Sequence, residues 1–387
     1  MFKFTINTKS KDTRARVGTL ITPHGKIETP AFIFCATKAA IKGLPGHLLK
    51  ELGTQIILSN TYHLMLKPGS KYIEEMGGLQ EFTAWRGPML TDSGGFQIFS
   101  LGYGGFEAEI KRAVTHYKSP HFKLSEDGAT FQSYYDGSKF FLTPEKSIQI
   151  QRELGADLIL VLDECIPYND DKLGTETSMI LSHKWAERSL KEFQKHDEGK
   201  QKLYGIIHGG IFPDLRKESA QFANTQPYFG YAIGGTLGRS KEQMYEIVDA
   251  STYYLNPKKP VHLLGIGSIR DIFTNIHFGI DTFDCVHPTR IARHGSALVK
   301  KSLKESINLR NHGYKQDLNP IENDCLCPTC QKYTRGYLHH LLMAREPLVA
   351  TLLTIHNIYF MNKMMEDIRY GIQSNTLKAV EEKYLSL

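Results

Sequence analysis

Eight short apolar runs recur along this chain, and most of them end in a polar or small residue. They are AFIFC at 31–35, QIILSN at 55–60, PMLTD at 88–92, DLILVLD at 157–163, LYGIIH at 203–208, YAIGG at 231–235, HLLGIG at 262–267 and TFDCV at 282–286. Between runs, residues 176–195 and 241–255 space apolar side chains as amphipathic helices, and the second begins with a capping-box pair, Ser240 and Gln243. Strands that alternate with helices indicate a parallel sheet, so the pattern predicts an α/β protein built as a closed (β/α)8 barrel.

Two segments interrupt this repeat. Residues 103–142 contain two Asp-Gly pairs among alternating apolar and polar residues, which predicts an antiparallel β-hairpin inserted after the third strand. After residue 303, a cysteine cluster precedes two helical stretches, 333–345 and 348–370, separated at Glu346-Pro347. We therefore expect a catalytic barrel over residues 1–303 and, over residues 304–387, a helical zinc-binding subdomain packed on it.

Polar residues or glycines end several of the runs, at the strand ends where such barrels carry their active sites. These residues are Asn60, Asp92, Asp163, His208, the Gly234-Gly235 pair, Gly267 and Asp284. Three carboxylates at one mouth suit attack at a sugar C1′ with retention, because one carboxylate can act as nucleophile and another as acid and base. The alternative is that some of these aspartates are helix N-caps, which are common where a strand leads into a helix.

The segment LTDSGGFQIFS is more specific than a single aspartate. Its glycines, Gly94 and Gly95, let backbone N–H groups approach a planar ligand. Ser93 and Gln97 offer hydrogen bonds, and Phe96 offers a stacking face. The segment therefore predicts a binding slot for a flat molecule, although a glycine-rich turn without a ligand has the same composition.

The segment FDCVHPTRIARHG sets Asp284 beside Arg290, Arg293 and His294. A candidate nucleophile thus lies within a few residues of a candidate phosphate-binding patch. The net charge of +6 permits an anionic partner but is too small to demonstrate one. A solvated basic loop is the alternative interpretation.

The segment ENDCLCPTC contains three closely spaced cysteines, Cys325, Cys327 and Cys330. This spacing is typical of zinc sites, and a closed structural site takes four ligands. His339, His340 and His356 are candidates for the fourth ligand, and spacing does not choose among them.

The remaining cysteines, Cys35, Cys165 and Cys285, are isolated, which indicates reduced thiols and not a disulfide framework. No stretch approaches the roughly 18 apolar residues of a membrane span. The segment MFKFTINTKSKDTRAR lacks the apolar block of a signal peptide. We therefore expect a cytoplasmic protein with no membrane association.

Taken together, the motifs SNTYHL, TDSGGFQ, DEC, AIGG, FDCVHPTR and CLCPTC resemble, in order, those of one family. This family is the tRNA-guanine transglycosylases, also called queuine tRNA-ribosyltransferases, in their bacterial form. The resemblance covers nearly the whole chain. It implies a barrel enzyme, usually a homodimer, that exchanges the wobble guanine of tRNAs with GUN anticodons for a 7-deazaguanine.

The resemblance also assigns roles. Asp284 matches the nucleophile that attacks C1′, and Asp92 matches the general acid and base. The positions that hold the base are Ser93, Gly94, Gly95, Phe96, Asp163, His208 and Gly235, with Asp163 accepting hydrogen bonds from the amidine edge. Two stretches match contacts to the anticodon loop: Gly265, Ile266, Gly267, Ser268, Ile269, Arg270 and Asp271, and then Thr289, Arg290, Ile291, Ala292 and Arg293. The fourth metal ligand matches His356, in the pair HN of TIHNIYF, so the resemblance implies one structural zinc ion per subunit.

Three departures from the family pattern concern the base. Phe96 stands where many bacterial members have Tyr, and His208 stands where Gln usually reads the base, so we expect its protonation to matter near pH 6–7. After AIGG, bacterial members usually continue Leu-Ala-Val-Gly-Glu, whereas this chain has Thr236-Leu237-Gly238-Arg239-Ser240. Gly238 in place of Val, and Ser240 in place of Glu, favour queuine over 7-aminomethyl-7-deazaguanine as the incoming base.

Two other functions remain open at this point. The aspartates alone would also allow a small-molecule nucleosidase or glycosidase on the same barrel, which would not require the basic patch or the cysteine cluster. A non-catalytic partner subunit of the same family is the other alternative, and the presence of both Asp92 and Asp284 argues against it.

Overall fold

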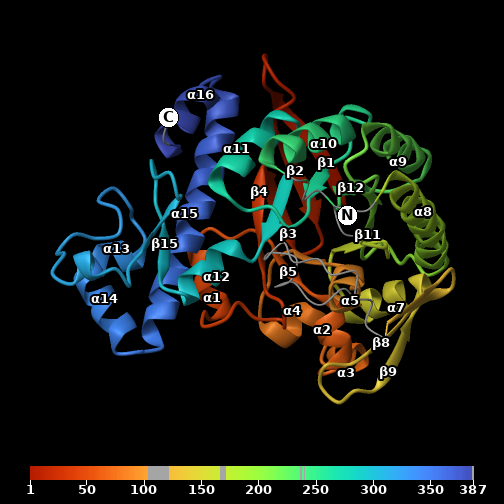
Figure 1. Cartoon of the computed structure of the whole chain (residues 1–387), viewed down its shortest axis with the longest axis horizontal. Coiled ribbons are helices and arrows are strands. Elements are labelled where there is room, and N and C mark those ends of the chain that lie inside the picture. The colour runs from red at the N-terminus through yellow and green to blue at the C-terminus, as the bar shows by residue number, and fades with distance from the viewer. Residues whose placement is uncertain (103–121, 166–170, 236–237, 239, 386–387) are drawn as a thin grey trace.

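The computed structural model describes residues 1–102, 122–165, 171–235, 238 and 240–385. Its centre is a closed barrel of eight parallel strands in the order β10-β11-β12-β13-β14-β4-β5-β6 (Figure 1). The barrel strands are β4 Ala31–Cys35, β5 Ile57–Ser59, β6 Met89–Thr91, β10 Leu158–Leu160, β11 Lys202–Ile207, β12 Gly230–Ile233, β13 Val261–Leu263 and β14 Thr282–Cys285. Each lies within one of the eight apolar runs or within one residue of it, so the predicted fold class is confirmed.

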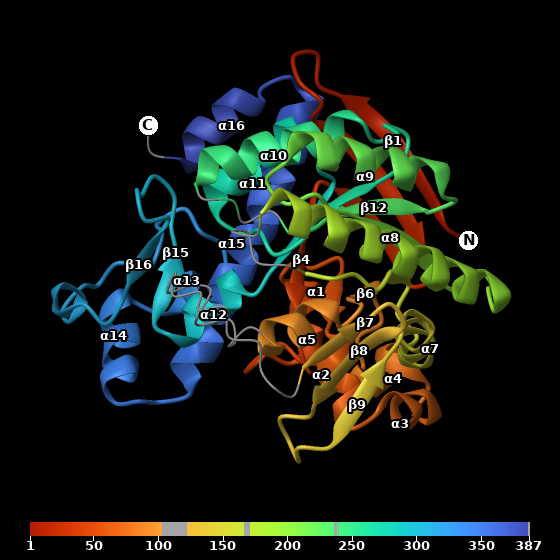
Figure 2. The same ribbon diagram turned by 45° about the vertical axis from the view of Figure 1, so that its right-hand side comes forward.

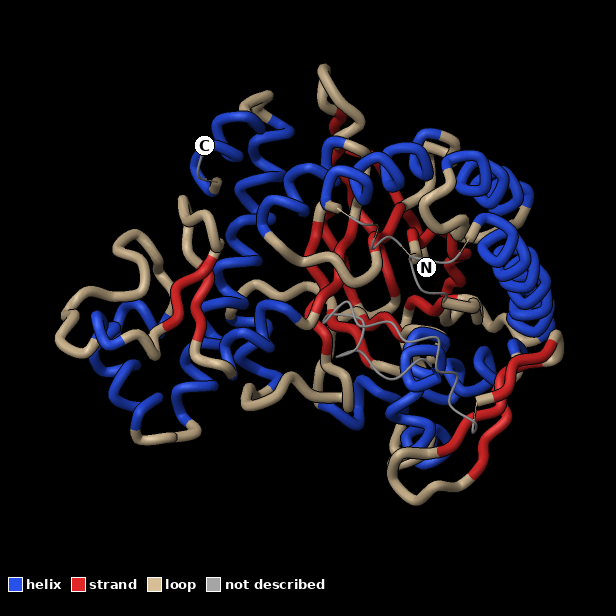
Figure 3. The backbone as a smooth tube through the Cα atoms, viewed as in Figure 1, coloured by secondary structure: helices blue, strands red, loops and turns tan. Residues whose placement is uncertain are grey.

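Helices follow the barrel strands and surround them (Figure 3). They are α1 Gly46–Glu51, α2 Thr61–Leu66, α3 Ser70–Glu75, α4 Gly78–Thr83, α5 Gly95–Gly102, α7 Pro144–Leu154, α8 Lys172–Lys195, α9 Pro213–Thr225, α10 Lys241–Tyr253, α11 Ile269–His277 and α12 His287–Arg293. The predicted cap of α10 is present, because the Gln243 amide donates to Ser240 Oγ at 3.2 Å. Each barrel strand is followed along the chain by a helix, and this arrangement brings the polar strand ends to one mouth.

An antiparallel sheet that the sequence reading missed lies across the amino end of the barrel. It consists of β1 Lys3–Lys9, β2 Arg16–Thr22 and β3 Gly25–Thr29. Buried Arg16 makes a bidentate ion pair with Asp281, the residue before β14. His24 Nδ1 lies 2.8 Å from Oδ1 of Asp157, the residue before β10. Both contacts join the sheet to residues that precede barrel strands, so the sheet covers the end opposite the mouth.

The insertion after β6 is larger than the predicted hairpin. Three antiparallel strands form it, β7 Lys123–Ser125, β8 Gly128–Gln132 and β9 Lys139–Leu142, beside α2 and α5 (Figure 2). Both Asp-Gly pairs lie at the connections between these strands, so the predicted antiparallel insertion is present and contains one strand more than a single hairpin. Residues 103–121 of the predicted insertion lie outside the described part of the chain.

The elements after the barrel project to one side of it (Figure 1). They are β15 Ser296–Leu298, β16 Ser306–Asn308, the 3-10 helix η1 His312–Tyr314, α13 Pro328–Lys332, α14 Arg335–Met343, α15 Leu348–Gln373 and α16 Leu377–Tyr384. The predicted break at Glu346-Pro347 separates α14 from α15. Helix α15 joins two cores, because Leu352 and Leu353 pack in the core that contains the cysteines, whereas Ile358 and Met361 pack in the barrel core.

Among the described residues, no helix combines the length and the apolar character that crossing a membrane requires.

Candidate active site and metal centre

Asp92, directly after β6, is fixed by three hydrogen bonds. Its Oδ1 accepts from the Thr61 amide at 2.7 Å, and its Oδ2 accepts from Asn60 Nδ2 at 2.5 Å and from Gln97 Nε2 at 2.8 Å. Burial raises the pKa of Asp92, although the three hydrogen bonds act to lower it. The negative charge of Asp284 raises this pKa further. A carboxyl group with a raised pKa is suited to giving and taking a proton.

Asp284, near the end of β14, is held through one oxygen. Its Oδ1 accepts from the Gly265 amide and lies beside His262 Nε2, each at 3.1 Å. Its Oδ2 is contacted by the Cys35 thiol at 3.5 Å. Oδ1 is therefore the anchored atom, and Oδ2, which has a weak thiol donor beside it, is the better placed to bond to another centre.

His262 is a site residue that sequence reasoning missed. Its side chain is buried, and its Nδ1 lies 3.0 Å from Thr282 Oγ1 while its Nε2 faces Asp284. A hydroxyl that donates to Nδ1 leaves the proton on Nε2, where it can donate to the carboxylate. The histidine lies within the apolar run of β13 and not at its end, so the rule of polar strand ends passed over it.

A third carboxylate, Asp163, is buried beside Ser93 and His208. Ser93 Oγ donates to Asp163 Oδ1 at 3.2 Å, and His208 Nε2 lies 3.4 Å from Asp163 Oδ2. Gly95 is required here, because a Cβ on it would lie 2.7 Å from the Asp163 carbonyl oxygen. Two backbone segments therefore approach each other closely at Gly95, which the absence of a side chain allows.

Burial controls the charge of Asp163 and of His208. It raises the pKa of Asp163 to about 6, with a contribution from the negative charge of Asp92. Burial lowers the pKa of His208 to about 3, and the positive charge of Arg216 adds to the decrease. The expectation that His208 titrates near pH 6–7 was wrong, because this imidazole is neutral throughout that range.

Buried polar atoms without a hydrogen bond lie in the same region. Among the described residues, His208 Nε2 and Gln97 Oε1 are two of these atoms. An unsatisfied buried polar atom is costly, and in a binding site a ligand can satisfy it. Phe96, at the start of α5, is 41 % exposed. A polar planar ligand therefore matches the donors, acceptors and ring that these side chains present.

Arg216, on α9, holds the loop that carries Gly235, and sequence reasoning missed it too. Its guanidinium is buried and donates to the carbonyl oxygens of Ile207, Gly210, Gly234 and Gly235. Burial lowers the pKa of Arg216 to about 9. One side chain thus joins the loops after β11 and β12, where His208 and Gly235 stand.

The loop after Gly235 is only partly described, and Thr236, Leu237 and Arg239 lie outside the described residues. Gly238 has φ +44, and a Cβ on it would lie 3.2 Å from the Met244 amide. Ser240 is occupied as the cap of α10. The described neighbours of Gly238 therefore explain a glycine there by backbone conformation, without reference to a base.

The candidate RNA-binding residues divide by exposure. Gly265 and Arg270 are exposed, and Ser268, Arg290, Ile291 and Arg293 are half-buried. The other predicted contacts are buried, namely Ile266, Gly267, Ile269, Asp271, Thr289 and Ala292. Asp271 accepts from Tyr245 Oη at 2.6 Å, which gives it a structural task. A surface contact with RNA can use the exposed and half-buried side chains only.

Two of these cations lie close together on α12. Burial and the positive charge of Arg290 lower the pKa of Arg293. Arg293 Nη1 also donates to the Thr289 carbonyl at 3.0 Å, which fixes its direction. Neighbouring guanidinium groups that repel one another favour an anion between or over them.

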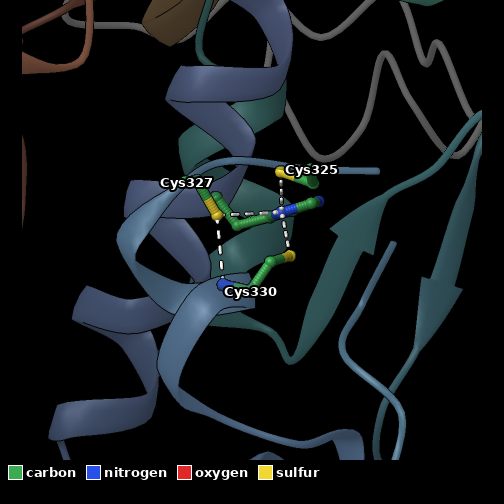
Figure 4. Close-up of side chains that lie close together, drawn as sticks. Cys325, Cys327 and Cys330 are labelled. Carbon is green, nitrogen blue, oxygen red and sulfur yellow. Dashed lines mark hydrogen bonds between the residues drawn. The ribbon is translucent and has the colours of Figure 1, made fainter. Parts of the chain in front are cut away.

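Four metal-ligand side chains meet between α13 and α15, and Figure 4 shows three of them, the cysteines, converging. His356 Nδ1 lies 3.3 Å from the sulfur of Cys330, 3.5 Å from that of Cys327 and 3.7 Å from that of Cys325. A tetrahedral zinc ion places sulfur and nitrogen ligands about 3.5 Å apart. The Nε2 of His356 lies 2.8 Å from the Leu298 carbonyl, so Nδ1 is left to face the metal.

The other candidate histidines take no part in this cluster. His339 is buried and its Nδ1 lies 2.8 Å from the Leu309 carbonyl, whereas His340 is exposed on α14. The four side chains that meet are Cys325, Cys327, Cys330 and His356, a set suited to a metal such as zinc.

The fold and these two centres define a class: a (β/α)8 barrel enzyme with carboxylates at its mouth and a Cys3His metal cluster beside it. The family model described as Queuine tRNA-ribosyltransferase matches residues 11–386. Relatives of that name are 46 % identical in Thermoanaerobacter sp. (99 % of this chain, 96 % of the relative) and 43 % identical in Roseiflexus sp. (99 % of each). One from Protochlamydia amoebophila is 42 % identical (97 % and 96 %). The chain belongs to the queuine tRNA-ribosyltransferase family, the tRNA-guanine transglycosylases.

Proposed function

We propose that this enzyme exchanges the wobble guanine of tRNAs with GUN anticodons for a 7-deazaguanine by double displacement. The observation that carries the proposal is the contrast between two carboxylates. Asp284 is anchored through Oδ1, with the Cys35 thiol 3.5 Å from Oδ2. Asp92 has a raised pKa and is fixed on both oxygens. One is suited to bond to carbon and the other to move a proton.

In the first step, Asp284 Oδ2 bonds to C1′ while the C1′–N9 bond breaks. The electron pair of that bond goes to the departing guanine, which takes a proton from Asp92. In the second step, the incoming base gives its N9 proton to Asp92 and attacks C1′, and the ester bond to Asp284 breaks. His262 and the Gly265 amide then stabilise the carboxylate as it leaves. Both aspartates return to their starting states, and the configuration at C1′ is retained.

Recognition of the base is assigned to the pocket of Ser93, Asp163 and His208, together with Gly94, Gly95, Phe96 and Gly235. An ionised Asp163 accepts from the N–H groups of the amidine edge, and a neutral His208 offers a donor to the base carbonyl. The support is the buried Nε2 of His208, which lacks a hydrogen bond among the described residues.

Capture of the free base should weaken in acid. Because burial raises the pKa of Asp163 to about 6, the accepting carboxylate is lost as pH falls through that value. We expect the apparent KM for guanine to be about tenfold higher at pH 5 than on the plateau above pH 7. Measuring KM for base and kcat separately from pH 5 to 8 tests this, with Asp163→Asn as the control that should bind weakly at every pH. A KM that is unchanged over this range would contradict the assignment.

For the incoming base, we propose queuine, with 7-aminomethyl-7-deazaguanine as the poorer substrate. The support is Ser240, a neutral side chain already used to cap α10, which provides no carboxylate for an ammonium group. The relatives described above also carry queuine in their names. Gly238 adds little support for queuine, because its positive φ is enough to explain a glycine at this position.

Exchange measurements test the function and the base together. The tRNA is first loaded with labelled guanine, and release of label is followed after a chase with either base. Ser240→Glu should increase use of the aminomethyl base about two- to fivefold relative to Ser240→Gln, which loses the cap equally but adds no charge. Faster release by the aminomethyl base with the unmodified enzyme would contradict the queuine preference. Cleavage of free guanosine without tRNA exchange would favour the nucleosidase alternative.

We further propose that Gly265, Ser268, Arg270, Arg290, Ile291 and Arg293 contact the anticodon loop. We expect Arg290→Glu combined with Arg293→Glu to raise the Kd for tRNA at least about tenfold and to flatten its dependence on salt. The reason is that each phosphate contact releases counterions when it forms, so a variant with fewer contacts releases fewer of them. Titrations between 50 and 200 mM salt, roughly the range over which such contacts respond, measure both quantities. The matched control is the double variant Lys11→Glu with Lys71→Glu. Equal tRNA affinity in the unmodified enzyme, the arginine double variant and this control would place the RNA elsewhere.

The remaining assignments concern assembly. We propose that the Cys3His cluster binds one structural zinc ion per subunit and that residues 304–387 act as a subdomain pinned to the barrel of residues 1–303. The support is α15, which carries His356 and contributes to both cores. A homodimer in the cytoplasm, where tRNA and reduced thiols occur, completes the proposal.

A further inference from the structure

Three tyrosine rings, one of them on α2, form a column that runs from the interior to the surface. Tyr62 is buried, and its ring centroid lies 6.0 Å from that of Tyr134, with 29° between the planes. The ring of Tyr135 follows at 4.2 Å from Tyr134 and 31°. Tyr134 and Tyr135 are 46 % and 41 % exposed, so the column ends in solvent.

Two lysines accompany the exposed end of this column. Lys38 Nζ donates to Tyr135 Oη at 2.8 Å and lies 5.1 Å from the centroid of the Tyr135 ring. Lys67 Nζ lies 5.6 Å from the same centroid. Exposed aromatic rings interleaved with ammonium groups are the combination that binds single-stranded nucleic acid, with stacking for the bases and positive charge for the phosphates.

The column is tied to the catalytic mouth through α2. Tyr62 follows Thr61, whose amide donates to Asp92. His63 Nδ1, the next ring along the helix, lies 3.0 Å from Tyr134 Oη. The tyrosines of the β8–β9 turn are therefore positioned by the same helix that positions the carboxyl group of Asp92.

The turn that carries the tyrosines is held by its own hydrogen bonds. The Ser133 amide donates to the Ser138 carbonyl at 2.8 Å, and the Gly137 amide donates to the Ser133 carbonyl at 2.9 Å. Asp136, the carboxylate of this turn, accepts from the Ser138 amide at 3.1 Å and from its hydroxyl at 2.7 Å. The rings are thus pre-organised, which lowers the entropy cost of receiving a ligand.

An anticodon loop that places one base in the pocket must unstack that base from its neighbours. We propose that Tyr134 and Tyr135, with Lys38 and Lys67, form a stacking platform for an anticodon-loop nucleotide next to the target base. The base extends the tyrosine column, and the lysines bind the adjoining phosphates. This inference rests on the proposed function and adds a second point of contact, on the side of the mouth formed by β5 and β6, to the basic residues of α12.

Tyr135 provides the sharpest test, because Tyr134 also packs against Tyr62 and His63. We expect Tyr135→Ala to raise the Kd and KM for tRNA by about 5- to 100-fold, the range that loss of one stacking aromatic produces. The KM for guanine and kcat at saturating tRNA should remain unchanged. Tyr135→Phe keeps the ring and should bind tRNA nearly as the unmodified enzyme does. Tyr370→Ala, which removes a tyrosine that is 67 % exposed on α15, is the matched control.

The outcomes separate the platform from the proposed function. If the unmodified enzyme exchanges guanine in tRNA and Tyr135→Ala binds tRNA normally, the platform is wrong and the function stands. If the unmodified enzyme exchanges no guanine in any tRNA, both are overturned. Sedimentation of the same proteins adds one more result: a variant that dissociates but keeps its tRNA affinity would assign the column to a protein interface and overturn the platform.

Discussion

Asp284→Asn should reduce guanine exchange by at least about 10³-fold, the scale of loss seen when a covalent nucleophile is removed. The amide cannot form the ester to C1′, although it can keep the hydrogen bond to His262 Nε2. Since the fold around β14 is preserved by this isosteric change, tRNA affinity and thermal stability should remain close to those of the unmodified enzyme. Single-turnover exchange with labelled guanine measures the loss.

A covalent complex provides the independent evidence. Denaturing electrophoresis of the unmodified enzyme, mixed with tRNA and without an incoming base, should show a protein–RNA adduct that Asp284→Asn lacks. Asp214→Asn, at an exposed aspartate in the first turn of α9 that pairs with Lys172, serves as the control for the substitution itself. An adduct-free unmodified enzyme, or normal exchange by Asp284→Asn, would exclude double displacement through this residue.

Removal of the metal should destabilise the protein more than any single surface substitution does. Structural zinc sites contribute apparent binding free energies of about 10–16 kcal/mol in isolated peptides, and that energy is folding energy. Cys327→Ser and His356→Ala are therefore expected to lose bound zinc and to unfold at a markedly lower temperature. Metal analysis by mass spectrometry and thermal unfolding measure the two effects.

The matched control is His340→Ala, which removes an exposed histidine from the neighbouring helix α14. It should keep one zinc ion per chain and the original unfolding temperature. If His356→Ala retains the metal, or if a zinc-free preparation unfolds at the same temperature as the loaded one, the Cys3His assignment is contradicted.

The barrel strands could be predicted because each is buried on both faces and so appears as a short continuous apolar run. The sheet β1–β3 could not be found in this way. Every residue of β1 is exposed or half-buried, and its alternation in KFTINTK is that of many polar segments. The insertion was recognised by its Asp-Gly pairs, but turn residues mark the turns and do not count the strands between them.

The candidate site shows the same division. Asp92 and Asp163 end apolar runs and Asp284 lies within the last one, so the strand pattern predicted where they lie. His262 and Arg216 act through contacts with residues distant in sequence, to Asp284 and to the Gly235 carbonyl. Such contacts depend on how the strands close into a barrel, which no local pattern records. His356, 26 residues from Cys330, was selected by resemblance because spacing alone left three histidines equal.

The sheet across the amino end of the barrel has a kinetic consequence. In the proposed reaction, departing and arriving bases both use the carboxyl-end mouth, because the sheet covers the other end, so they must pass in turn through one passage. Guanine that has not left excludes its replacement, and it should therefore compete with the incoming base and slow the second half-reaction as it accumulates. During the interval between the two bases, the ester at Asp284 must survive beside an empty pocket. The lifetime of that ester against water, and not its rate of formation alone, then decides whether a tRNA leaves with a new base or with none.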